Sequence, residues 1–418
     1  MLYAAGRLVS LVGTGIQDVA IPLFVLDLTG SAAIMGTFLI VSMVPRLALY
    51  PLAGVVGDKL NRKQIMIWTD FGRGAVLLVL AFLASRDLVT IPVLLLAQFL
   101  VSVMNGLFGP ATGAMLADLV EPEELTRANS IMGGVNSTSM IIGPALGGVI
   151  YGLFGVTGAF LANGVSFLCS GFSEIFIRYT QETGALGGFR EVLGSMAEGL
   201  RFVRKSRGLM VLLVFALLVN FFMGPFFAIH LPYVMRIEIG FSAERFGLVQ
   251  ASFMGGLLLG NVLIASLFAR SKVKNMLNRA LLIESGLVFV LVAVIMPGSL
   301  EQLGYASLLT FGALVGIYLL FGLFNAFINT PIHVGIQRLA PTQYRARVLS
   351  VVEVSSQGIM PIGFGLMGIM LDLYPAYIIA LGIAVVELAI VIPFVLRYSS
   401  AVAADLEAKS PEETEVEG

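Results

Sequence analysis

The sequence predicts an all-α integral membrane protein with twelve transmembrane helices in two six-helix halves. Hydrophobic residues make up 58% of the 418 positions, and the mean hydropathy is +0.95. That much apolar surface exceeds what a soluble domain buries. Segments 88–117 and 208–235 contain no Asp, Glu, Lys or Arg. Each is longer than the roughly 20 residues with which a helix crosses the hydrocarbon core of a bilayer. The short alternating segments typical of a β-barrel are not found in the sequence.

The hydrophobic pattern places twelve spans along the chain. Segment 128–173 is uncharged and long enough for two spans, on either side of residues 154–158. The 47 glycines suit close helix packing, because small residues let two backbones approach within lipid. The first apolar run lacks the flanks of a signal peptide, so we interpret it as a retained span. The predicted spans are 3–28, 33–57, 64–85, 90–117, 128–152, 158–178, 208–235, 243–269, 275–297, 304–334, 346–371 and 375–397.

The distribution of Lys and Arg orients these spans. With both termini inside, cytoplasmic segments hold 20 of the 25 basic residues, and the outer loops hold only Arg86, Arg236 and Arg245. This asymmetry predicts cytoplasmic termini. We expect a multi-pass protein of a bacterial-type inner (plasma) membrane. The acidic tail, 398–418, lacks apolar residues at helical spacing and is predicted to be disordered.

One long loop, residues 179–207, separates the two halves. Apolar residues recur in it at helical spacing, at Phe189, Leu193, Met196, Leu200 and Val203. The pattern predicts an amphipathic helix, which either lies on the inner leaflet or ties the two halves together. The expected organisation is a six-helix bundle over 1–178, this linker over 179–207, a second bundle over 208–397 and the tail.

The two halves show weak internal similarity in a consistent register. Residues 28–32, after the first span, resemble residues 239–243 after the seventh. Pro22 corresponds to Pro232, and Pro110 corresponds to Pro331. Such a repeat of two six-helix halves is typical of secondary transporters.

A charged loop between the second and third spans carries the most informative motif. Its residues include Gly54, Gly57, Asp58, Lys59, Arg62 and Lys63. The spacing closely resembles the cytoplasmic loop between helices 2 and 3 of the major facilitator superfamily. Asn61 stands where that family usually has Gly, and we expect it to tolerate the left-handed backbone that Gly would supply. The resemblance implies that Asp58 caps the start of the eleventh span, around 346–350, and that Arg62 bridges Asp58 and Asp118. These contacts would stabilise an outward-open state.

The fifth span resembles the "antiporter" motif of exporters in the same superfamily. The matching residues are Gly134, Gly143, Pro144, Gly147 and Gly148. Longer strings at 116–125, 190–207, 255–260 and 344–372 resemble the macrolide-efflux and enterobactin-exporter branch. This resemblance covers nearly the whole chain. It implies proton-driven export of amphipathic compounds, although the branch also contains siderophore and lipid transporters. Gln98 stands near the place where drug exporters often carry an Arg in the fourth span.

An ionisable residue within a span is a functional candidate by default. Asp18 lies near the middle of the first span, on a polar stripe with Ser10, Thr14 and Gln17. It is either a proton-coupling carboxylate or half of a structural ion pair with Arg46. Glu353, in the eleventh span, is a candidate for either a second proton site or a contact to a cation.

Other charged residues in the spans receive structural interpretations. Asp70 and Arg73 are three apart and should form a local ion pair. Glu284 and Glu387 lie in spans that are peripheral in the expected architecture. His230 and His333 have no metal-ligand spacing, so no metal or other cofactor is expected.

The predicted substrate surface combines aromatic and carboxamide side chains, which suit bulky and weakly discriminated ligands. Its candidates are Gln98, Asn105, Phe108, Asn220, Phe227, Tyr318, Asn325 and Asn329.

The sequence therefore predicts a secondary active exporter of drug- or macrolide-like molecules, driven by proton antiport through alternating access. The alternatives are a siderophore or lysolipid exporter, and a non-transporting receptor on the same fold. No phosphate loop, catalytic triad or metal cluster occurs in the sequence, so an ATP-driven pump is disfavoured, and we do not expect an enzyme. The expected partners are the amphipathic substrate, protons and membrane lipid, without nucleic acid, and the expected state is a monomer.

Overall fold

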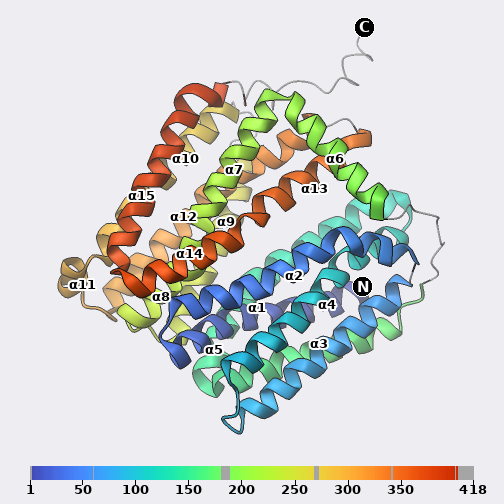
Figure 1. The fold of residues 1–418 in the computed structure, drawn as a ribbon, viewed down its shortest axis with the longest axis horizontal. Helices are drawn as coiled ribbons and strands as arrows, with labels where there is room; N and C mark the ends of the chain where they lie inside the picture. The colour runs from blue at the N-terminus through green and yellow to red at the C-terminus, as the bar shows by residue number, and fades with distance from the viewer. Residues whose placement is uncertain are drawn as a thin grey trace. The chain divides into compact units, whose positions relative to one another are not determined.

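The computed structural model of the chain describes residues 2–59, 61–179, 189–267, 273–339, 342–400 and 402. Every regular element in these residues is a helix (Figure 1). Eleven helical segments in this part of the chain are long and apolar enough to cross a membrane. One of them, α5 (Leu125–Ile175), contains two of the predicted spans. The predicted all-α membrane fold is therefore confirmed.

The described helices belong to two compact units. The first contains Met1–Arg190 with Met235–Ala251, and the second contains Glu191–Val234 with Ser252–Gly418. The first unit is built from α1 (Leu2–Thr29), α2 (Ala32–Lys59), α3 (Arg62–Ala84), α4 (Ile91–Asp118), the short η1 (Pro122–Glu124) and α5.

The long helix α5 reverses direction at Gly155. This residue has φ 61° and ψ −162°, a backbone conformation that only glycine adopts readily. Gly143, before the reversal, packs on Gly15 of α1, while Asn163, after it, hydrogen-bonds Gln17. Both arms of α5 therefore reach the same level of α1, and the two predicted spans form a hairpin.

The second unit contains a longer series of helices. They are α6 (Phe189–Lys205), α7 (Arg207–Pro225), the π-helical η2 (Phe226–His230), α8 (Leu231–Tyr233), the π-helical η3 (Val234–Glu238), α9 (Ala243–Ser266), α10 (Val273–Ile295), α11 (Pro297–Leu303), α12 (Leu308–Leu339), α13 (Thr342–Gly358), α14 (Met360–Leu373), α15 (Ala376–Pro393) and η4 (Phe394–Tyr398). Residues 235–251, from η3 and the start of α9, are part of the first unit.

The eleventh predicted span is interrupted at Ile359, between α13 and α14. Pro361 follows directly, and its ring removes a backbone N–H that a continuous helix would use. The span predicted over 346–371 is present as Val351–Leu373, and the interruption inside it was not predicted.

The amphipathic helix of the linker is α6. Its residue Val203 is fully buried in a cluster with Leu209, Leu213, Ile336 and Val348. The C-terminal turn of α6 thus packs against the core of the second unit. Most of the other apolar side chains of this helix, like the tail after residue 402, lie outside the described residues.

Residues 235–251 are held in the first unit by polar contacts with α1 and α5. Arg236 donates from Nε to Asp27 Oδ1 at 2.6 Å and from Nη2 to Asp27 Oδ2 at 2.8 Å. Tyr151 of α5 donates its hydroxyl to the same carboxylate at 2.8 Å. One carboxylate near the end of α1 thus binds partners from two other segments.

Asn61 is the N-cap of α3. Its φ and ψ are −63° and 115°, and its side-chain oxygen accepts a hydrogen bond from the backbone N–H of Gln64 at 3.2 Å. The backbone here is extended, so the tolerance of Asn for a left-handed conformation is not used in this structure. The residue is useful because Asn satisfies one of the orphan N–H groups of the first helical turn.

Replacing Asn61 by Ala should therefore destabilise the start of α3 by about 1 kcal/mol, whereas Asn61→Ser should retain most of the stability because Ser is also a good cap. Thermal unfolding of the purified variants in detergent measures the difference. Equal stability of the Ala and Ser variants would show that the cap contributes nothing.

Candidate functional site

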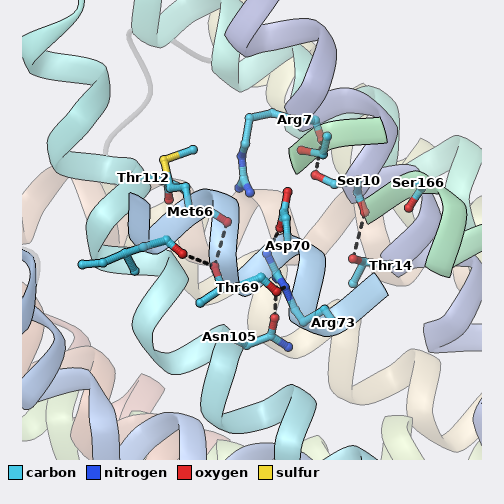
Figure 2. A network of polar contacts seen from close by, with 12 residues as sticks. Arg7, Ser10, Thr14, Met66, Thr69, Asp70, Arg73, Asn105, Thr112 and Ser166 are labelled. Carbon is cyan, nitrogen blue, oxygen red and sulfur yellow. Dashed lines mark hydrogen bonds and ion pairs between the residues drawn. The ribbon is translucent and has the colours of Figure 1, made fainter. Parts of the chain in front are cut away.

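A network of buried charges lies within the first unit, between α1, α3, α4 and α5 (Figure 2). Asp70 is 0% exposed and Arg73 is 4% exposed, and the two form the predicted ion pair one turn apart on α3. Arg73 also donates to the Asn105 side-chain oxygen at 2.6 Å and to the Thr69 carbonyl at 3.3 Å. Four groups on two helices thus share this polar centre.

Phe108 of α4 lies between two guanidinium groups. The guanidinium carbon of Arg73 is 4.0 Å from its ring centroid, and that of Arg7 is 5.0 Å away. Arg73 also lies 4.3 Å from the Phe167 ring. The negative faces of these rings stabilise cations that are held out of water. Asn105 and Phe108, predicted as substrate contacts, are used in this structure to hold Arg73, and their role in binding stays a prediction.

Two members of the network, Arg7 and Glu174, were not identified from the sequence. Arg7 lies inside the first predicted span, 3–28, and Glu174 lies close to the end of the sixth, 158–178. In the structure Glu174 is 2% exposed, and its Oε2 accepts no hydrogen bond from the described residues. A charged residue inside an apolar run is the signal that could have indicated both.

Asp18 lies about three turns beyond Arg7 on α1, along the same stripe as Ser10 and Thr14, and has no contact with the buried ion pair. Its neighbours Gln17 and Val19 are buried, whereas Asp18 itself is exposed and forms no ion pair or hydrogen bond with the described residues. Arg46, on α2, is exposed as well and acts on Asp18 only through its charge. The predicted Asp18–Arg46 ion pair is not formed in this structure.

Other polar residues of the stripe around Asp18 form hydrogen bonds within the first unit. Thr14 donates its hydroxyl to the Ser10 carbonyl at 2.9 Å, and the Gln17 side chain accepts a hydrogen bond from Asn163 of α5. Asp18 is the residue of this stripe for which the described part of the chain shows no hydrogen bond.

The charged loop is partly described. Arg62 forms the predicted ion pair with Asp118, at 2.7 Å, and Tyr179 donates its hydroxyl to the same carboxylate, also at 2.7 Å. Partial burial and this hydrogen bond to Asp118 raise the pKa of the Tyr179 hydroxyl above its ordinary value. Lys63 donates to the Ile175 carbonyl at 2.8 Å, near the end of α5. The side chains of Asp58 and Lys59, and the surroundings of Gly54 and Gly57, lie outside the described residues.

The glycines of the predicted antiporter motif divide into two groups. A Cβ at Gly143 would lie 2.8 Å from Gly15 Cα, and one at Gly147 would lie 2.9 Å from the Ile16 carbonyl oxygen. Gly148 packs in the same way on the backbone of Ala243. A Cβ at Gly134 would meet nothing within 4 Å. The close approach of α5 to its neighbours thus requires Gly143, Gly147 and Gly148. Pro144 lies inside the same helix, next to Gly143.

Replacing Gly143 by Ala should destabilise the α1–α5 contact by about 1–3 kcal/mol, because the backbone of Gly15 cannot move aside as a flexible side chain could. Gly134→Ala is the matched control, with no steric cost expected. Thermal unfolding in detergent compares them, and equal losses for the two variants would contradict the packing role.

Most of the other residues predicted to contact substrate lie in the second unit. Phe227 contacts the rings of Phe321, Phe253 and Tyr318, with centroids 5.3, 6.1 and 6.2 Å away. Tyr318 is 1% exposed. Asn220 donates within its own helix to the Ala216 carbonyl. The Asn329 side chain is exposed and donates to Asn325 Oδ1 at 2.9 Å.

Glu353 is exposed on α13 and accepts a hydrogen bond from Gln357 at 3.2 Å. Gln98, on α4 of the first unit, is partly exposed. Within the described residues, no group of three or more His, Cys, Asp and Glu side chains could hold a metal ion.

The sequence model of the Major Facilitator Superfamily matches residues 3–363. The chain belongs to the major facilitator superfamily. Macrolide efflux protein A of Streptococcus pyogenes is 24% identical over 403 residues, which cover 94% of each chain. The match to this efflux protein thus extends over nearly all of both chains, and the predicted resemblance to the superfamily is confirmed.

Solved structures show the same fold as this member of the superfamily. The nucleoside transporter NupG has a TM-score of 0.71 at 14% identity and covers 94% of this chain and 99% of its own. A bacterial homologue of the iron transporter ferroportin has a TM-score of 0.67 at 18% identity, with 95% and 98% covered. At these identities the likeness concerns the fold alone. Members of this superfamily are membrane carriers, and this chain is a multi-pass membrane transporter.

Proposed function

We propose that this transporter is a secondary active exporter of amphipathic small molecules of the drug- or macrolide-like class, driven by proton antiport through alternating access. The observation that carries the proposal is Asp18, an exposed and unpaired carboxylate in the middle of the apolar helix α1. A charged group in a span is costly and is kept where it has a function. Such a carboxylate can bind a proton on one side of the membrane and release it on the other.

The substrate class is supported by the side chains available in each unit. The first unit presents Gln98 in a largely apolar helix, and the second presents Asn220, Asn329 and the aromatic cluster around Phe227. Such surfaces bind large apolar molecules with few fixed polar contacts. A relative that matches over 94% of both chains is a macrolide efflux protein, which supports the same class.

We further propose that the protein lies in the inner membrane with both termini in the cytoplasm, because 20 of its 25 basic residues then lie on the cytoplasmic side.

Transport in proteoliposomes with an imposed pH gradient tests the proposal. The panel contains a macrolide, a catecholate siderophore and a lysolipid. We expect macrolide uptake into inside-acidic vesicles by inversely oriented protein, and its loss when a protonophore collapses the gradient. Transport of the siderophore or the lysolipid alone would refute the substrate class. Macrolide transport that is indifferent to the protonophore would refute proton coupling.

A further inference from the structure

Glu174 is a buried carboxyl group with no hydrogen-bond donor at Oε2. It is 2% exposed, and none of the ion pairs among the described residues includes it. Ionisation of a carboxyl group that is removed from water and has one oxygen without a donor is unfavourable, and binding of a proton removes this cost. The geometry therefore favours the neutral acid at this position.

The groups that face Glu174 come from two neighbouring helices. Tyr3 and Arg7 lie on α1, and Asp70 and Arg73 lie on α3. Two glycines bring these helices close to α5: a Cβ at Gly171 would lie 3.2 Å from Asp70 Cβ, and one at Gly6 would lie 2.5 Å from Ser173 Oγ. Lys63 binds the carbonyl of Ile175, the residue next to Glu174.

The two cations in this cluster differ in what holds them. Arg73 is bound by Asp70, Asn105 and the Thr69 carbonyl. Arg7 Nε is buried without a hydrogen-bond partner, and its guanidinium rests on the Phe108 ring. Figure 2 shows Arg7 extending from α1 towards the Asp70–Arg73 pair. Arg7 is therefore the cation available to an ionised Glu174.

We propose that Glu174 is a proton-binding site in the first unit, separate from Asp18. When Glu174 loses its proton, it forms an ion pair with Arg7. While the carboxyl group of Glu174 is protonated, the guanidinium of Arg7 stays over the Phe108 ring. Loss of the proton creates a carboxylate that draws the guanidinium to itself, and α1 and α5 are then linked by an ion pair. The ligand is a proton rather than a metal cation, because two guanidinium groups in the same cluster repel a metal ion. Use of this site in transport rests on the proton-driven export proposed above.

Infrared spectroscopy of the full-length protein in proteoliposomes tests the site without any transport assay. The C=O stretch of a protonated carboxyl group is followed from about pH 5 to about pH 10, a range that brackets the values documented for buried Glu. We expect a band at neutral pH that disappears as the pH rises. Glu387 is also buried with an Oε2 that lacks a hydrogen-bond partner, so it contributes its own component to the band, which Glu387→Gln removes. Glu174→Gln should remove a further component, and Asp18→Asn should leave that component in place.

A second pair of variants separates proton exchange from a merely structural role. Because the Arg7 cation favours the ionised form of Glu174, Arg7→Gln should raise the midpoint pH at which the band disappears. Arg86→Gln, which removes an exposed Arg beyond the end of α3, should leave the midpoint unchanged. If Glu174→Gln does not fold, Glu174→Asp should keep a protonated carboxyl band at a shifted frequency.

Three results would overturn the site: no protonated band at neutral pH in the wild type, a band that is unchanged in folded Glu174→Gln, or an unchanged midpoint of the Glu174 component in Arg7→Gln. The band can be present while proton-driven export is absent, which would refute the proposed function alone. Export without the band would refute this site alone.

Discussion

Replacing Asp18 by Asn is expected to reduce export driven by a pH gradient to background while the protein still inserts and folds. The Asn side chain nearly preserves the shape of Asp but cannot bind and release a proton. Asp18 forms no ion pair or hydrogen bond with the described residues, so the substitution leaves no buried partner uncompensated. The measurement is macrolide uptake into proteoliposomes with an imposed gradient, at matched amounts of folded protein.

Asp87→Asn is the matched control for this substitution. Asp87 is exposed after α3 and has φ 54°, a conformation that Asn also tolerates. The control should transport at the wild-type rate. Gradient-driven uptake by Asp18→Asn at the same rate would eliminate Asp18 as the coupling group.

Asp18 and Arg46 are also expected to contribute independently to stability. Because they form no ion pair in this structure, the losses in Asp18→Ala and Arg46→Ala should add within about 0.5 kcal/mol in the double variant. A double variant more stable than either single variant would indicate a buried pair, since each single substitution would then leave one charge uncompensated.

The largest loss of stability is expected when Asp70 is replaced by Leu. The carboxylate is fully buried against Arg73, whose guanidinium cannot lose its proton and would be left as an uncompensated charge. Breaking such a buried pair from one side costs about 3–5 kcal/mol. The double variant Asp70→Leu with Arg73→Met should recover much of the loss, because it removes both charges.

Arg62→Gln is the matched control for the buried pair. Arg62 and Asp118 also form an ion pair, but their side chains are 18% and 37% exposed. An exposed pair contributes no more than about 1 kcal/mol. Thermal unfolding in detergent compares the two substitutions, and a loss in Arg62→Gln as large as that in Asp70→Leu would contradict the dependence on burial.

The fold could be predicted from the sequence because the bilayer thickness dictates the length of each apolar run. The hairpin in 128–173 was expected around residues 154–158, and the structure places its reversal at Gly155. The break at Ile359 was missed because a Pro within a transmembrane helix interrupts it only in some contexts. The capping role of Asn61 was not predicted because its neighbours in sequence do not reveal whether a polar residue ends one helix or caps the next.

The buried network could be predicted only in part. Asp70 and Arg73 are neighbours on one helix, so their spacing alone indicates a pair. The position of Phe108 between Arg73 and Arg7 depends on how α1, α3 and α4 pack, and no local pattern encodes that. Glu174 was missed for the same reason, because its surroundings come from helices far away in the sequence.

The single-residue reversal at Gly155 has a consequence for biosynthesis and for labelling. The two membrane-crossing arms of α5 are joined without a polar loop. They are therefore expected to insert into the lipid together, as one helical hairpin. The same compactness leaves no segment there into which an epitope tag could be inserted or that a protease could cut. Accessibility experiments on this part of the molecule therefore need single cysteines beside the reversal, at exposed positions such as Leu153 or Phe154, which are 69% and 67% exposed.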